Sequence, residues 1–230
     1  MRVLIKYFIA ASNAVLVVAL CLYAAIHLPS FSTAFYSWQF SANNTPAVVD
    51  MQHDELLRVT EHMLDYMRGR TPYLQIDAVV GGQVRPFFSE REILHMVDVR
   101  DLFELGASIR NIAAAWFLAT VSILGFMRVP ILLTLSIAYR WVIGVVVAAL
   151  GLLTVLIARD FDHAWRIFHE IFFDNDLWLL DPATELLINI VPLAFFITLS
   201  IFVGVIFLAL LTLLFVAAHF CCKRERRKRP

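Results

Sequence analysis

Four long apolar runs limit this chain to folds whose helices cross a lipid bilayer. The runs cover residues 3–28, 112–127, 141–158 and 186–220. A helix needs about 20 apolar residues to span the hydrocarbon core, where it satisfies its own backbone polar groups. With 60% hydrophobic and only 17% charged residues, the chain has too little polar surface to cover a water-soluble globule. We therefore predict an all-α integral membrane protein with four transmembrane helices and an extracellular, mostly helical cap.

The apolar runs divide the chain into successive predicted segments. They are transmembrane helix 1 (1–28), the extracellular cap (29–111), transmembrane helix 2 (112–127) with a cytoplasmic connection (128–140), transmembrane helix 3 (141–158), a second extracellular segment (159–185), transmembrane helix 4 (186–220) and a basic cytoplasmic tail (221–230). The first run also fits a signal peptide, but it is longer than a usual signal core and no Ala-x-Ala cleavage site closes it. We expect a retained anchor.

The basic residues predict the orientation of the spans. The two ends of the chain, Arg128 and Arg140 together carry 10 basic residues and 1 acidic residue, whereas residues 29–111 and 159–185 carry 9 basic and 18 acidic residues. Because Lys and Arg accumulate in cytoplasmic loops, both termini should be cytoplasmic in a multi-pass protein of the cell membrane. A basic tail can also bind nucleic acid, but directly after a span it is typical of an anchor that touches anionic membrane lipid. We expect no nucleic-acid partner.

The predicted cap contains three patterns. Residues 30–46 are aromatic and rich in Ser and Asn, which is typical of an interfacial loop. Apolar residues recur at helical spacing over 48–67, which predicts an amphipathic helix with His53 and His62 on its solvated face. Short apolar stretches on either side of Gly81-Gly82 predict a β-hairpin.

A capping box begins the next predicted helix. Ser89 precedes Glu92 by three positions, and the helix should end near Leu105. Glu92, His95 and Asp98 are spaced three apart and share one face of this helix. A carboxylate beside the histidine ring would fix its tautomer and favour its protonated form. The same spacing is typical of a surface row of salt bridges, so both interpretations remain open.

The second extracellular segment combines a histidine with an aromatic helix stripe. His169 lies at the edge of the stripe, whose members are Phe161, Trp165, Phe168 and Phe172. The acidic turn at 174–176 should stop the helix, and Asp181-Pro182 has the pattern of an N-cap that opens the last apolar segment. We expect half of an active site in this segment.

Two motifs resemble a known family. The run H-E-I-F-F-D-N-D-L-W-L-L-D-P at 169–182, the upstream E-x-x-H-M-x-D-V at 92–99 and the four-span layout are similar to the lipoprotein intramolecular transacylase (Lit) family of Gram-positive bacteria. The resemblance implies a membrane acyltransferase acting on diacylglyceryl-modified bacterial lipoproteins. In that reaction the sn-2 acyl chain moves to the α-amino group of the N-terminal cysteine and leaves an N-acyl lyso-form. The resemblance also implies two catalytic histidines, which fall by motif on His95 and His169.

The chemistry of this transfer agrees with a histidine pair. The attacking amine must lose a proton and the departing glyceryl oxygen must gain one, which two imidazoles can do near neutral pH. The tetrahedral intermediate closes an eight-membered ring, so much of the catalysis should come from holding the substrate folded. We assign the base to His169 and the partner to His95, although the reverse assignment is nearly equivalent. No cofactor and no metal are expected.

Other residues are candidates for contacting the substrate or supporting the histidines. They are Glu92, Asp98, Trp165, Phe168, Phe172, Phe173, Asn175, Asp176, Trp178 and Asp181. The aromatic members can wall a lipid pocket. Asn175, Asp176 and Asp181 have competing structural roles as turn formers or helix caps.

Several other functions compete with acyl transfer. A zinc peptidase would need a second histidine where the chain has Phe173, so H-E-x-x-H is incomplete. Asp174 and Asp176 could bind a divalent ion, but no phosphate-handling motif accompanies them. A transporter lacks support because no span carries an acidic residue at its centre. The main alternative is a non-catalytic membrane accessory or sensory subunit whose extracellular cap binds a partner.

Overall fold

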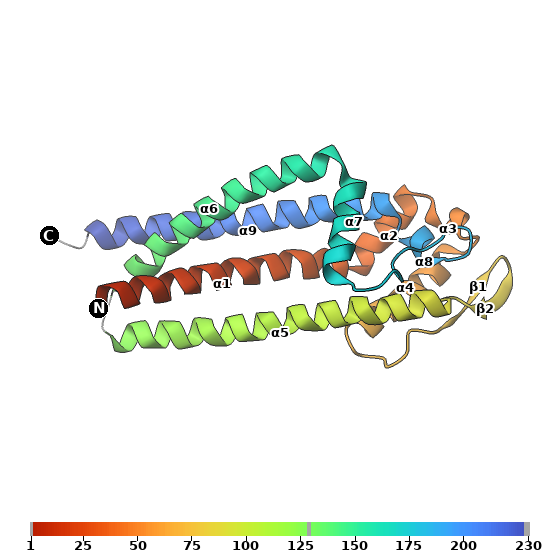
Figure 1. Ribbon diagram of the computed structural model, residues 1–230, viewed down its shortest axis with the longest axis horizontal. Helices are drawn as coiled ribbons and strands as arrows, with labels where there is room; N and C mark the ends of the chain where they lie inside the picture. The colour runs from red at the N-terminus through yellow and green to blue at the C-terminus, as the bar shows by residue number, and fades with distance from the viewer. Residues whose placement is uncertain (1, 128–129, 228–230) are drawn as a thin grey trace. The chain divides into compact units, whose positions relative to one another are not determined.

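The computed structural model describes residues 2–127 and 130–227, and its chain order is shown in Figure 1. The described elements are α1 (Arg2–Ser30), α2 (Thr33–Ala42), α3 (Thr45–Val48), α4 (His53–Met67), β1 (Asp77–Val80), β2 (Gln83–Pro86), α5 (Glu90–Phe126), α6 (Ile131–Arg159), α7 (Phe161–Phe172), α8 (Leu187–Ile190) and α9 (Leu193–Arg227). They divide between a membrane unit and a second unit. The membrane unit is Met1–His27, Ala107–Arg159 and Phe202–Pro230, and the second unit is Leu28–Gly106 and Asp160–Ile201.

Within the described residues, four helices are long and apolar enough to cross a membrane. By length and composition, the candidate spans are Leu4–Ser30, Glu90–Phe126, Ile131–Arg159 and Leu193–Arg224. Their outward surfaces are apolar: Val145, Leu152 and Leu213 are each about two-thirds exposed. Such a surface is stable in lipid and would be unfavourable in water. The prediction of an all-α integral membrane protein with four membrane helices is confirmed.

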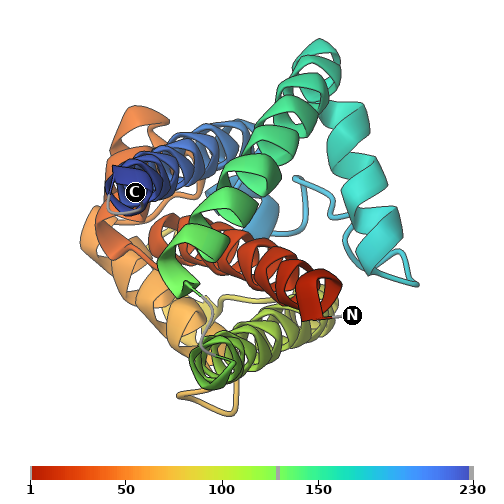
Figure 2. The same cartoon turned by 90° about the vertical axis from the view of Figure 1, so that its left-hand side faces the viewer.

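The membrane unit is held together by small apolar contacts and one polar cluster. Val18 of α1, Ile143 of α6 and Phe207 of α9 pack in one group, and Figure 2 shows these helices beside one another. The fully buried Asn13 of α1 donates its amide to the Thr120 hydroxyl of α5 at 2.6 Å. The Tyr139 hydroxyl of α6 donates to the side-chain amide oxygen of Asn13 at 2.6 Å. These hydrogen bonds fix the register of three helices where apolar contact alone is nonspecific.

The end of α5 and the start of α6 differ from the sequence expectation. α5 is continuous to Phe126 and passes through Gly106, because that glycine keeps helical geometry instead of the left-handed conformation that ends a helix. α6 begins at Ile131 instead of Trp141, so the expected connection shortens, and Arg128 and Val129 lie outside the described residues. Arg140 is accommodated inside α6, where its guanidinium lies 6.0 Å from the Phe215 ring centroid.

The last span also begins later than expected. The sequence placed its start at Leu186, with Asp181 as the cap and Pro192 inside the first turns. In the structure α8 ends at Ile190 and α9 begins at Leu193, because Pro192 has no N–H to continue a helix through this position. The Asp181 carboxylate caps only a local turn, by accepting from the Ala183 N–H at 2.9 Å.

The second unit has its own apolar core. Aromatic side chains of α2 bury beside α4 and the start of α9, and Phe35 lies edge-on to Phe195 at 5.4 Å between ring centroids. The expected interfacial loop over 30–46 is therefore wrong, since its aromatic residues recur at helical spacing and Ser32 caps the resulting helix. α4 begins at His53 instead of Val48, after the left-handed residue Asp50.

The hairpin and its glycine turn are confirmed. β1 and β2 pair antiparallel with Val79 opposite Val84, and Gly81 and Gly82 both have positive φ angles, as a two-residue hairpin turn requires.

The two histidines of α4, His53 and His62, are half-buried instead of solvated. The His53 ring lies 3.0 Å from the Ser37 hydroxyl, and the Nε2 atom of His62 is buried without a partner among the described residues.

Candidate functional site

Glu92 fixes the start of α5 and thereby the position of His95 one turn later. The Ser89 N–H donates to Glu92 Oε2 at 2.6 Å, and the Glu92 N–H donates to the Ser89 hydroxyl at 3.3 Å, which is the reciprocal pattern of a capping box. The second carboxylate oxygen accepts from the Leu187 N–H at 2.5 Å. Burial raises the pKa of Glu92, and these hydrogen bonds act in the opposite direction. Glu92 thus joins α5 to α8 and is not the partner of His95.

Asp160 and Phe173 set the limits of α7, which carries His169. The Asp160 carboxylate accepts from the His163 N–H at 2.9 Å at the start of the helix. Phe173 is extended, with φ −130° and ψ 129°, and its N–H donates to the His169 carbonyl at 2.8 Å. The predicted helix and its stop before the acidic turn are confirmed. His169 therefore lies in the last turn of α7, close to the loop that follows.

Aromatic rings surround His169. Trp178 stacks on it at 4.7 Å with an interplanar angle of 26°, and Trp165 approaches edge-on at 4.7 Å. Phe168 and Phe173 lie 5.3 and 5.6 Å away. The ring is 6% exposed as a result, and burial lowers its pKa.

A backbone hydrogen bond fixes the tautomer of His169. Its Nδ1 atom lies 2.7 Å from the Trp165 carbonyl oxygen. Because a carbonyl only accepts hydrogen bonds, Nδ1 carries the proton and Nε2 carries the lone pair. The arrangement leaves Nε2 as the basic atom of this ring.

The two motif histidines meet in the second unit. The ring centroids of His95 and His169 are 6.2 Å apart, and Phe173 lies 5.5 Å from His95. His95 is 8% exposed, and its Nδ1 atom is buried without a hydrogen-bond partner among the described residues. The structure thus brings the two motif histidines into one aromatic cluster.

Burial lowers the pKa of both histidine rings. The pKa of His95 falls to about 4, mainly because burial disfavours the charged form and next because His169 is nearby. Asp98 raises it and Arg91 lowers it by smaller amounts. Asp98 acts in the expected direction, but desolvation outweighs it, and Glu92 is engaged elsewhere.

Asn175 connects the loop after α7 to α5. Its amide nitrogen donates to Asp98 Oδ2 at 2.9 Å, and its amide oxygen accepts from the Leu177 N–H at 3.0 Å. Its backbone carbonyl accepts from the Trp178 indole N–H at 2.9 Å. Asn175 therefore holds the tryptophan that stacks on His169.

The family model described as lipoprotein intramolecular transacylase Lit matches residues 11–196, a range that includes both motif histidines. The chain belongs to the Lit family. As a member of this family it is an enzyme, a lipoprotein intramolecular transacylase. The alternative of a non-catalytic accessory or sensory subunit is therefore wrong.

Solved structures of a Lit protein have the same fold. The membrane integral transacylase Lit from Bacillus cereus superposes with a TM-score of 0.77 at 19% identity and covers 97% of this chain and 98% of its own. Two variants of that protein, with one histidine replaced by alanine or by arginine, give TM-scores of 0.74 and 0.69, also at 19% identity. They cover 98% of this chain each, and 97% and 94% of their own chains. No curated protein sequence matches the chain.

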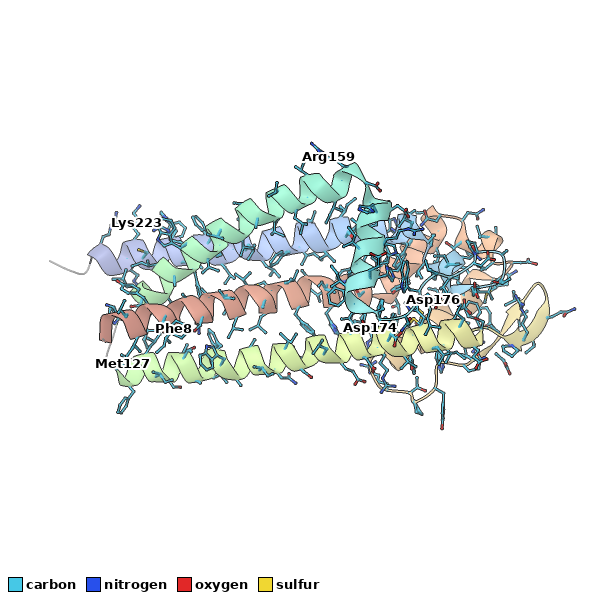
Figure 3. The ribbon with its side chains drawn as sticks, viewed as in Figure 1. Phe8, Met127, Arg159, Asp174, Asp176 and Lys223 are labelled. Carbon is cyan, nitrogen blue, oxygen red and sulfur yellow. The ribbon has the colours of Figure 1, made fainter. Side chains whose placement is uncertain are left out.

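In this Lit chain the predicted site residues separate into two groups. The structure brings together His95, His169, Trp165, Phe173 and Trp178, with Asp98 and Asn175 behind them. Phe172 is half-exposed and contacts Phe168 instead of either histidine, and Asp181 caps its exposed turn. Figure 3 labels Asp174 and Asp176 in the loop that leaves α7. The Asp176 side chain is 79% exposed.

Two further residues at the site of this Lit chain, Arg91 and Phe196, were not predicted from the sequence. Arg91 donates to the Asp176 backbone carbonyl, and its guanidinium lies 3.7 Å from the Asp176 carboxylate. Arg91 lies four positions before His95 and therefore on the same helix face, so the sequence spacing could have predicted its place near the site. Phe196 packs on Trp165 at 4.2 Å from a distant segment, and no local pattern indicates that contact. The described residues bring no three potential metal ligands together.

Proposed function

We propose that this Lit enzyme moves the sn-2 acyl chain of a diacylglyceryl-cysteine lipoprotein to the cysteine α-amino group by acid–base catalysis at His169 and His95. The proposal is carried by one observation: two buried histidine rings from the two motifs lie 6.2 Å apart in an aromatic environment. Such a site suits an ester attached to acyl chains. The product is the N-acyl lyso-form.

His169 is the base in this proposal. Its Nε2 lone pair takes a proton from the amine as the nitrogen attacks the ester carbon. The new C–N bond forms as the carbonyl becomes an oxyanion. Nδ1 stays protonated throughout, because the Trp165 carbonyl can only accept.

His95 returns the proton to the leaving group. Both rings begin neutral, because burial lowers their pKa values. The proton that the glyceryl oxygen gains must therefore be matched by the proton that the amine loses. In our proposal His95 donates its ring N–H to that oxygen while its other nitrogen accepts a proton from the His169 imidazolium. The C–O bond breaks as this transfer completes, and both rings end neutral.

The direct test is a reconstitution with a synthetic diacylglyceryl lipopeptide. The product is an isomer of the substrate, so tandem mass spectrometry must locate the acyl chain. His95→Gln and His169→Gln should each lower the rate by about 10²- to 10⁴-fold. His62→Gln is the matched control, because this half-buried histidine of the same unit belongs to neither motif. Wild-type rates in both motif variants, with folding verified by circular dichroism, would contradict the mechanism.

We also propose that both termini are cytoplasmic and that the histidines act on the extracellular side. The charge distribution supports this orientation. Within the membrane unit, the start of α1 and the end of α9 lie at one end in Figure 1. In Figure 3 Met127 and Lys223 share that end, and Arg159 lies at the opposite one. Single cysteines placed at residue 127 or 159 of a cysteine-free variant should differ in labelling of intact cells: only the one at 159 should react with an impermeant maleimide.

A further inference from the structure

A cationic cleft lies between α6 and α9 at the Lys223 end of the membrane unit. Its volume is about 520 Å³, and its lining residues are Arg140, His219, Cys222, Lys223 and Arg227. An adjacent hollow of about 370 Å³ is lined by Phe220, Lys223, Arg224 and Arg227. The proposed acyl transfer uses none of these residues.

The lining carries positive charge without a described counter-charge. Arg140, Lys223 and Arg227 form no salt bridge among the described side chains, and the lining contains no carboxylate among them. The Nε atom of Arg140 is buried and has no hydrogen-bond partner in the described part of the chain. A buried guanidinium donor without an acceptor is unfavourable, so this atom points to an anionic ligand.

The surroundings of the cleft are apolar. On α9, Leu213, Val216 and Phe220 are 67%, 44% and 64% exposed, and Trp141 follows Arg140 on α6 with 76% exposure. Cations beside an open apolar helix surface match a molecule with a charged head and hydrocarbon chains. A free inorganic anion would use the cations but not the apolar surface.

We propose that this cleft binds a phosphate-bearing anion, supplied by the headgroup of an anionic phospholipid. A guanidinium donates paired hydrogen bonds to phosphate oxygens, and an ammonium adds a point charge. Basic pockets between membrane helices bind acidic headgroups by this chemistry. The site is defined by Arg140 and Lys223 from two helices, so it differs from the general attraction of a basic tail to a charged membrane.

Native mass spectrometry of the full chain in detergent tests the proposal. The probes are phosphatidylglycerol, zwitterionic phosphatidylcholine and inorganic phosphate. We expect phosphatidylglycerol to bind at least about tenfold more tightly than the other two, since each charge-assisted hydrogen bond lost weakens binding by roughly that factor. Arg140→Gln and Lys223→Gln should each weaken it by about tenfold, and Arg224→Gln by less than about twofold.

Arg224→Gln is the matched control because it removes the same charge from the same helix without touching the cleft lining. Equal weakening by Lys223→Gln and Arg224→Gln would indicate diffuse attraction to the tail and overturn the proposal. Equal affinity for inorganic phosphate and phosphatidylglycerol would overturn the lipid source. Lys223 is exposed, so its variant keeps the test valid if Arg140→Gln does not fold. All variants should retain transacylase activity.

Discussion

Asn175 donates its amide hydrogen to Asp98 at 2.9 Å, and this bond joins the loop after α7 to the helix that carries His95. The same asparagine accepts the indole N–H of Trp178, whose ring stacks on His169. Asn175 therefore links both motif histidines, through its backbone carbonyl to Trp178 and through its side chain to Asp98 on α5. Loss of the side-chain bond should affect the geometry of the pair more than the stability of the fold.

Asn175→Asp should lower kcat/KM by about tenfold, because two carboxylates would then face each other and the loop would move from α5. The exchange variant Asp98→Asn with Asn175→Asp restores an amide–carboxylate pair and should recover most of the activity. Asp176→Asn is the control: its exposed carboxylate lies 3.7 Å from Arg91, and such pairs contribute about 0–1 kcal/mol. Lipopeptide turnover measures all three, and no recovery in the exchange variant would contradict the coupling.

Trp178 should act through its ring more than through its indole hydrogen bond. Trp178→Phe keeps an aromatic surface over His169 and should reduce kcat by no more than about threefold. Trp178→Ala removes the stacking and should reduce kcat by about 10- to 100-fold, with a smaller change in KM. Trp141→Ala, at an exposed position of the membrane unit, should leave both constants unchanged. Equal losses in the phenylalanine and alanine variants would assign the effect to the hydrogen bond instead.

The stability of the protein should fall on the acid side because of His95. Its folded pKa is lowered to about 4 from an ordinary value of 6.5, so between these values the unfolded state binds more protons than the folded state. Stability therefore rises with pH through this window and is constant above it with respect to this group. The Tm of the wild type should drop more than that of His95→Gln between pH 6.5 and pH 4. Parallel Tm curves would contradict the buried neutral ring. His169 contributes in the same direction.

The polar cluster of the membrane unit should determine stability without affecting chemistry. Tyr139→Phe removes the hydroxyl that donates a hydrogen bond to the Asn13 amide oxygen. The unpaired oxygen inside the bundle should lower the free energy of unfolding by about 1 kcal/mol. We expect a lower Tm in detergent and an unchanged turnover by the folded fraction. Ser122→Ala removes only a bond to its own helix and serves as the control. An equal Tm in the two variants would show that the cluster contributes little.

Local patterns predicted those parts of the fold and of the site that depend on residues close together in sequence. The Ser89–Glu92 capping box, the hairpin turn at Gly81-Gly82 and the extent of α7 all follow from interactions within a few residues. The meeting of His95 and His169 followed from motif resemblance, since no periodicity relates positions so far apart.

The unpredicted parts depend on distant segments. The second carboxylate oxygen of Glu92 bonds Leu187, a partner 95 positions away, so spacing wrongly suggested His95 as its neighbour. The sign of the His95 pKa shift depends on burial by residues of α7 and its loop, which composition cannot reveal. The start of α6 was misplaced because Arg140, an arginine inside an apolar run, was taken as a boundary, although the helix continues through it.

In the proposed mechanism, the hydrogen bond between His169 and the Trp165 carbonyl separates reactivity from selectivity. Every amino acid supplies a carbonyl at position 165, so exchanging the indole for another ring would reshape the cage without changing which imidazole nitrogen is basic. Substitutions of this ring would then change the preferred length of the acyl chain among relatives. The protonation pattern of His169 would stay the same, because a backbone carbonyl sets it.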